Sequence, residues 1–82
     1  MPTFLDHHTM PDPSPEMLDG MAQRLRAGAA DEHGVTGLNV YLAEGEAYCL
    51  TDAPDADAVV RSHEAVGVPI RRDEIVEVKP VV

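Results

Sequence analysis

Tryptophan is absent from this chain, and Phe4, Tyr41 and Tyr48 are its only aromatic residues. A folded core must therefore be built mainly from aliphatic side chains. The chain also has a single cysteine, Cys49, which excludes an internal disulfide. A single cysteine also excludes every zinc site that needs two thiolate ligands from one chain.

Positive charge is scarce as well. Six lysine and arginine residues stand against fifteen aspartate and glutamate residues, which gives a formal net charge of −9 at pH 7. Such a surface repels phosphate backbones and anionic lipid head groups, so we expect no nucleic-acid partner and no electrostatic docking to membranes. Cations are the small partners that this charge favours.

Long apolar runs are missing too, and none could span a bilayer. The first residues, MPTFLDHH, are polar and acidic where a secretory signal is basic and then apolar, so we expect a cytoplasmic protein. A chain of 82 residues is too short for two independent cores. Residues 1–82 are therefore predicted to form a single domain.

The first part of the chain predicts a strand followed by a helix. The strand is expected at Thr3–Met10, and the proline-rich stretch 11–15 ends it. Ser14 is suited to cap the N-terminus of the helix, and Gly34 is expected to end it. The apolar residues of this helix recur at helical spacing and form one stripe: Leu18, Met21, Ala22, Leu25 and Ala29.

The rest of the chain predicts a hairpin, a second helix and a final strand. Apolar alternation indicates strands at Val35–Ala43 and Ala47–Thr51, joined by a short turn. Asp55 can cap a helix that carries His63 on its apolar side. Alternation over Ile75–Val82 indicates the last strand.

The resulting order, β-α-β-β-α-β, is typical of the ferredoxin-like α+β fold, with an antiparallel sheet and two helices on one of its faces. The other face would carry Phe4, or Leu5 if the register is reversed, together with further aliphatic residues. An uncovered apolar face on so small a domain favours burial against a second copy. We therefore predict a homodimer that forms through the open face of the sheet.

Four histidines stand out among the carboxylates: His7, His8, His33 and His63. Imidazole is a preferred ligand of nickel, copper, zinc and cobalt, and carboxylates can complete the coordination shell. Successive side chains of a strand point to opposite faces, so His7 and His8 belong to two environments, with Asp6 on the side of His8. The alternative is that both are polar histidines on a partly exposed strand.

The other candidates have equally simple alternatives. Asp31, Glu32 and His33 could place carboxylates and an imidazole near one exposed ion, or His33 could interact with the dipole at the end of the first helix. His63 is either a ligand that meets other site residues across the fold or a hydrogen-bonded residue at the core boundary. Cys49 is interpreted as a small buried hydrophobic residue, reactive only if a neighbour stabilises its thiolate.

Five segments resemble a family of small ferredoxin-like proteins that includes nickel-binding members. They are residues 32–35, residues 48–54 with their Tyr-Cys-Leu-Thr-Asp-Ala-Pro sequence, residues 58–63 with a helical histidine, residues 67–69, and residues 73–78. The resemblance implies a dimer that holds nickel near its surface through histidines and carboxylates and that serves nickel sequestration or detoxification. His33 and His63 match recurring positions of the family, whereas many relatives have glutamate and arginine in place of His7 and His8.

We therefore predict a non-catalytic protein that binds Ni²⁺, or another divalent transition metal, reversibly. The predicted ligands are His7, His8, His33, His63, Asp6, Asp31 and Glu32. Protons compete for imidazole, so affinity should fall below about pH 6.5. Each bound cation lowers the repulsion between acidic dimers, so metal could also induce larger assemblies.

Two other functions fit the same sequence. The first is a small-ligand binder or enzyme with a pocket where His63 and Cys49 meet. The second is an interaction module that recruits a protein partner through its acidic surface and open sheet edge. The fold alone does not choose among these functions.

Overall fold

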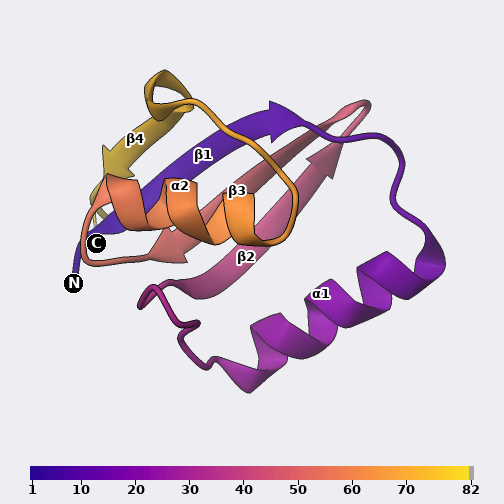
Figure 1. Cartoon of the computed structure of the whole chain (residues 1–82), viewed down its shortest axis with the longest axis horizontal. Coiled ribbons are helices and arrows are strands. Elements are labelled where there is room, and N and C mark those ends of the chain that lie inside the picture. Colours follow the sequence, from indigo (N-terminus) through magenta and orange to yellow (C-terminus); the bar gives the residue numbers. More distant parts are fainter. Residues whose placement is uncertain (82) are drawn as a thin grey trace.

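The computed structural model describes residues 1–81 and has the element order that the sequence predicts (Figure 1). Its elements are β1 (Thr3–Thr9), α1 (Pro15–Ala27), β2 (Thr36–Ala43), β3 (Glu46–Asp52), α2 (Ala56–Ala65), the short 3-10 helix η1 (Arg72–Glu74) and β4 (Ile75–Val78). The strands form one sheet in the order β2-β3-β1-β4, and every neighbouring pair is antiparallel. The predicted ferredoxin-like fold is thus confirmed. Over the described part of the chain, no helix is long and apolar enough to cross a membrane.

Both helices begin where the sequence predicts. The side chain of Ser14 accepts a hydrogen bond at 3.2 Å from a backbone amide in the first turn of α1, and Asp55 caps α2 in the same way at 2.8 Å. The predicted end of the first helix at Gly34 is wrong. Gly28 already adopts the left-handed conformation, with φ of 64°, and its amide donates to the carbonyl of Arg24, which ends α1 six residues earlier than expected.

The last strand is shorter than predicted. It ends at Val78 rather than Val82, because its partner strand β1 begins at Thr3, which lies opposite Val78. Residues 79–81 have no strand to pair with, and Pro80 has no backbone N–H to donate. Val82 itself lies outside the described residues.

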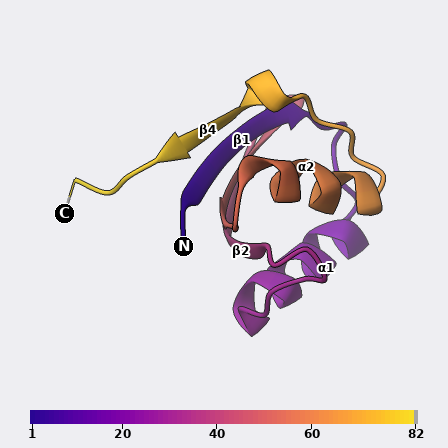
Figure 2. The ribbon, with the colours of Figure 1, turned by 60° about the vertical axis from the view of Figure 1, so that its left-hand side comes forward.

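The alternation of β1 divides its side chains between two faces of the sheet. Both helices cover the same face of the sheet (Figure 2). Phe4, Asp6 and His8 are buried on this covered face, whereas Leu5 and His7 lie on the other face. Of the two registers that the sequence allows, the one with Leu5 on the open face is therefore correct. Phe4 instead belongs to the core beneath α2.

The two helices bury their apolar sides unequally. Helix α2 packs Ala56, Ala58 and Val59 into the core, and Val59 has no exposed surface. Helix α1 has no buried residue along its whole length. The core is therefore concentrated between α2, β1 and β4, and the space beneath α1 is less tightly filled.

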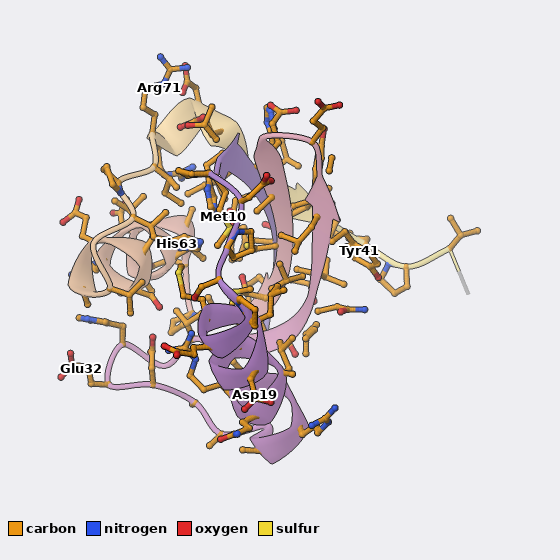
Figure 3. All side chains as sticks on the ribbon, turned by 90° about the vertical axis from the view of Figure 1, so that its right-hand side faces the viewer. Met10, Asp19, Glu32, Tyr41, His63 and Arg71 are labelled. Carbon is orange, nitrogen blue, oxygen red and sulfur yellow. The ribbon has the colours of Figure 1, made fainter. Side chains whose placement is uncertain are left out.

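The open face of the sheet is lined by apolar and aromatic side chains. Leu5 lies opposite Val76 of β4, and the ring of His7 stacks on Tyr48 with 5.1 Å between centroids. Tyr41 lies on the side of the sheet away from His63 and is 54% exposed (Figure 3). Dimerisation through this face stays a prediction.

Candidate metal centre

Three elements bring four potential metal ligands together on the covered face of the sheet. Asp6 and His8 are two residues apart on β1 and therefore share a face. The antiparallel register places Cys49 of β3 directly opposite Asp6. His63 comes from α2, one helical turn after the buried Val59, which turns this side of the helix toward the sheet.

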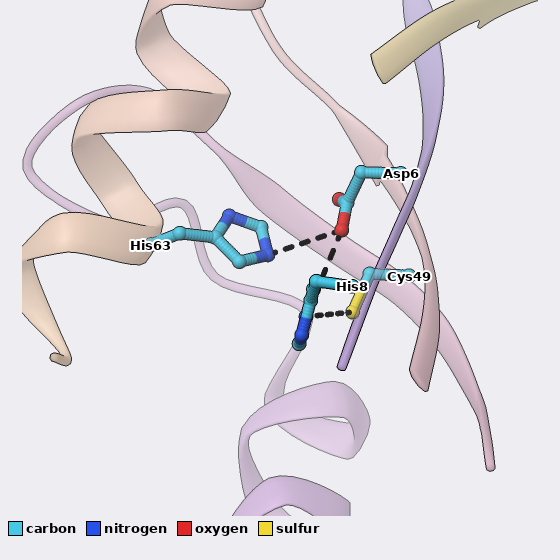
Figure 4. Close-up of side chains that lie close together, drawn as sticks. All are labelled: Asp6, His8, Cys49 and His63. Carbon is cyan, nitrogen blue, oxygen red and sulfur yellow. Dashed lines mark hydrogen bonds and ion pairs between the residues drawn. The ribbon is translucent and has the colours of Figure 1, made fainter. Parts of the chain in front are cut away.

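The donor atoms of this cluster converge on one point (Figure 4). Nε2 of His63 lies 3.4 Å from Oδ1 of Asp6, and Nε2 of His8 lies 3.8 Å from the same oxygen. Sγ of Cys49 lies 3.8 Å from Nε2 of His8. All four donor atoms are within 4.8 Å of one another.

Each imidazole is held with Nε2 toward the cluster. Nδ1 of His63 lies 2.8 Å from the carbonyl oxygen of Val59, and Nδ1 of His8 lies 3.0 Å from the carbonyl oxygen of Thr9. A carbonyl oxygen only accepts, so Nδ1 carries the proton in both rings. The same carbonyl contact fixes the tautomer of most histidines that bind metals through Nε2.

Asp6 is the most deeply buried of the four potential ligands. It has no exposed surface, and neither of its carboxylate oxygens has a hydrogen-bond partner among residues 1–81. A buried carboxylate without hydrogen bonds is costly unless a positive charge lies close to it. The two imidazoles are the groups within ion-pair distance, and their side chains are only 12% and 6% exposed.

The pKa of His63 reflects this environment. Burial on its own would lower the pKa, but the nearby carboxylate of Asp6, the thiol of Cys49 and the carbonyl of Val59 outweigh burial and raise the pKa to about 10. In the metal-free protein at pH 7, His63 is therefore a cation paired with Asp6. A metal ion that binds here takes over the role of that proton.

The donor set fits a divalent transition metal. Bonds of about 2.1 Å in a tetrahedral shell separate neighbouring donors by about 3.4 Å, close to the separations observed here. One carboxylate, two imidazoles and one thiolate suit zinc, cobalt, nickel and copper better than magnesium or calcium, which prefer oxygen ligands. The carboxylate of Asp6 and a thiolate on Cys49 carry one negative charge each, and together they balance the two positive charges of the ion.

The structure separates the remaining predicted ligands from this cluster. His7 lies on the opposite face of the sheet, where its Nε2 is 2.9 Å from a carboxylate oxygen of Glu46. His33 lies 3.6 Å from the carboxylate of its neighbour Glu32. Each of these exposed pairs offers one imidazole and one carboxylate.

His33 and Asp31 occupy a loop, so the expectation that His33 ends a helix is wrong. Asp31 has both carboxylate oxygens engaged: one accepts from the backbone amides of His33 and Val35, and the other accepts from the hydroxyl of Ser62. Burial alone would raise the pKa of Asp31, but these hydrogen bonds lower it below its usual value. Asp31 thus holds the loop against α2.

Cys49 is the ligand that sequence reasoning left out of the metal set. Its neighbours along the strand give no sign of a site, since Ala47 and Thr51 share its face. Only the pairing of β3 with β1 brings the thiol to Asp6 and His8. His63 and Cys49 do line one cavity, as the alternative prediction of a shared pocket requires.

Residues 4–78 match the family described as "Nickel responsive protein SCO4226-like". The chain belongs to this SCO4226-like family. Its fold also matches the crystal structure of SCO4226 from Streptomyces coelicolor A3(2), with a TM-score of 0.72 and 31% sequence identity over 98% of this chain and 99% of that one. No curated protein matches the chain.

Membership of the SCO4226-like family agrees with the cluster in two respects. The family is named for a response to nickel and not for a catalytic activity. The match from residue 4 to residue 78 includes β1, β3 and α2, the three elements that carry the four donors.

Proposed function

We propose that this SCO4226-like protein binds a divalent transition metal reversibly through Asp6, His8, Cys49 and His63, and that nickel is the metal it sequesters. The observation that carries the proposal is the fully buried carboxylate of Asp6, which faces two imidazoles whose Nε2 atoms are oriented toward it. The name of the family supports nickel as the metal. No catalytic step is part of the proposal.

A purely structural ion pair is the simplest competing explanation. A pair of Asp6 with His63 alone would account for the charge of the carboxylate. It would not account for the second imidazole, from His8, or for the thiol of Cys49 beside it. A metal ion engages all four groups at once, which is why we favour it.

Selectivity for nickel cannot come from the donor set alone. Stability constants of such ligands rise from nickel to copper in the Irving–Williams order. Copper should therefore bind the isolated protein at least as tightly as nickel. Selection of nickel would then depend on which metal is available when the protein is made.

The exposed pairs are proposed as weaker, secondary positions. His7 with Glu46, and His33 with Glu32, offer two donors each and leave most of the coordination to water. An ion on either pair could bridge neighbouring molecules, because each cation also reduces the charge of −9 that keeps them apart. We further propose a homodimer through the open sheet face, which a dimeric mass by light scattering would support and a monomeric mass would refute.

The test of the buried site compares ligand variants with exposed-histidine variants. Titration with Ni²⁺ should show about tenfold or greater loss of affinity in Cys49→Ser and in His63→Gln, since even groups that only orient ligands contribute about 10–100-fold. The matched controls, His7→Gln and His33→Gln, should retain affinity close to wild type. A thiolate-to-nickel absorption band should appear in the wild type and be absent from Cys49→Ser.

The reverse pattern would refute the site. If the exposed-histidine variants lose nickel while Cys49→Ser and His63→Gln keep it, the metal binds at the surface. Circular dichroism of each variant would establish that the fold is intact. Anomalous diffraction at the nickel edge would then locate the ion directly.

A further inference from the structure

Helix α1 turns its apolar side toward a cavity. The cavity has a volume of about 570 Å³ and lies between α1, α2 and the sheet. From α1 it is lined by Met17, Gly20, Met21 and Leu25, which recur at helical spacing. Leu25 lies against Gly37 of β2. The two are so close that a Cβ added to Gly37 would lie 3.0 Å from Cδ2 of Leu25. The helix thus touches the sheet near its C-terminal end and spans an apolar space along the rest of its length.

The floor of this cavity is the metal cluster. His8, Cys49 and His63 all line the cavity, whereas Asp6 has no exposed surface and lies behind them. An ion held by the four ligands would therefore be approached from the cavity on the side opposite Asp6. A further ligand could reach it there without displacing any protein donor.

The residues that line the cavity indicate which kind of small molecule it would bind. A volume of this size is in the range of small-molecule sites, about 300–1,000 Å³, and its apolar walls suit an aliphatic body. The metal at the floor suits one terminal donor. Arg24 adds a positive charge to the wall, and the one carboxylate there, Asp31, is engaged with Ser62 and backbone amides.

We propose that the cavity binds a small aliphatic carboxylate whose head group becomes a fifth ligand of the metal, beside the four protein donors. The inference rests on the proposed metal site and adds the class of organic ligand that the site takes. Such a ligand would pack along Met17 and Met21 while its carboxylate meets the ion between His8 and His63. The protein would then carry a metal together with an organic molecule.

Gly20 provides a matched pair of test variants. It lies in the middle of the cavity-lining stripe of α1, and a Cβ at this position meets no atom within 4 Å. Both leucine and alanine favour a helix more than glycine does, so Gly20→Leu and Gly20→Ala should fold. Gly20→Leu fills part of the cavity, whereas Gly20→Ala adds only one methyl group.

The experiment uses the Co²⁺-loaded protein, because the visible absorption of cobalt reports a change of ligands. Octanoate should alter the spectrum of the wild type and of Gly20→Ala at about tenfold or more lower concentration than acetate does, since each buried methylene adds affinity. In Gly20→Leu the advantage of octanoate over acetate should be lost. Affinity for Co²⁺ itself should be the same in all three proteins.

The outcomes separate the two proposals. Equal responses to octanoate and acetate, or an undiminished octanoate response in Gly20→Leu, would overturn the ligand cavity and leave the metal site standing. Failure of the wild type to bind Co²⁺ or Ni²⁺ would overturn the metal site, and the carboxylate ligand with it.

Discussion

Metal binding should expel the proton that the free protein holds on His63. The pKa of this residue is about 10 because its ring faces the carboxylate of Asp6, so at pH 7 almost every molecule carries the proton. A metal ion can coordinate Nε2 only after that proton has left. Proton and metal therefore compete for the same nitrogen.

The loss of metal affinity that this proton causes depends on the difference between the pKa of His63 and the pH of the measurement. A pKa about three units above pH 7 reduces the apparent affinity about 1,000-fold, or by about 4 kcal/mol, relative to a pH above 10. While the pH is below the pKa of His63, about 10, each rise of one pH unit should increase the affinity for metal about tenfold through His63 alone. The sequence by itself placed this competition below about pH 6.5, and the carboxylate of Asp6 moves it upward by raising the pKa of His63.

The assay is nickel affinity as a function of pH, measured with nickel buffers from pH 5.5 to pH 9. The thiol of Cys49 must also lose a proton to bind, so the measurement is made in Cys49→Ser, where Asp6 and the carbonyl of Val59 still raise the pKa of His63. Calorimetry in two buffers with different ionisation enthalpies should independently report release of about one proton at pH 7 in this variant. His63→Gln in the same background should release about one proton fewer than Cys49→Ser alone.

A flat pH profile would refute this reasoning. If the Kd of Cys49→Ser does not change between pH 7 and pH 9, then His63 either carries no proton in the free protein or does not bind the metal. A profile that changes only below about pH 6.5 would mean that the carboxylate of Asp6 does not raise the pKa of His63 as the structure indicates.

Three further predictions concern stability. The folded-state pKa of His63 lies above its unfolded value of 6.5, so its stabilising effect is complete below about pH 6.5 and is lost as pH rises through about 10. The free energy of unfolding of the metal-free protein, measured by urea denaturation, should therefore fall by up to about 5 kcal/mol over that interval. His63→Gln should show a flatter dependence on pH. Asp31→Ala should lower the free energy of unfolding by about 1–3 kcal/mol at neutral pH, through loss of the bonds to Ser62 and the loop backbone, with the difference from wild type shrinking in acid below the lowered pKa. Gly28→Ala should cost about 1 kcal/mol because of its φ of 64°, whereas Gly20→Ala should stabilise α1 by about 1 kcal/mol, and equal shifts of the two in thermal melts would contradict the assigned helix end.

Local rules were sufficient for much of the fold. Ser14 and Asp55 cap helices because their side chains can reach backbone amides two or three residues ahead, whatever the rest of the chain does. Alternation along the first strand likewise put Asp6 and His8 on one face and His7 on the other. The helix end at Gly28 was missed because Gly28 and Gly34 both adopt a positive φ, and the sequence pattern does not say at which of them the helical hydrogen bonds stop.

The amino-acid sequence specifies which chemical groups the chain carries, with four histidines and one cysteine in an acidic chain. Its periodicity also predicts the β-α-β-β-α-β order of the elements. Which of these groups come into contact depends on strand pairing and helix packing. Cys49 reaches His8 across 41 residues through strand register, and His63 reaches Asp6 because α2 lies over β1. The carboxylate of Asp6 is removed from water beside His63, and this proximity raises the pKa of the imidazole and holds a proton on it.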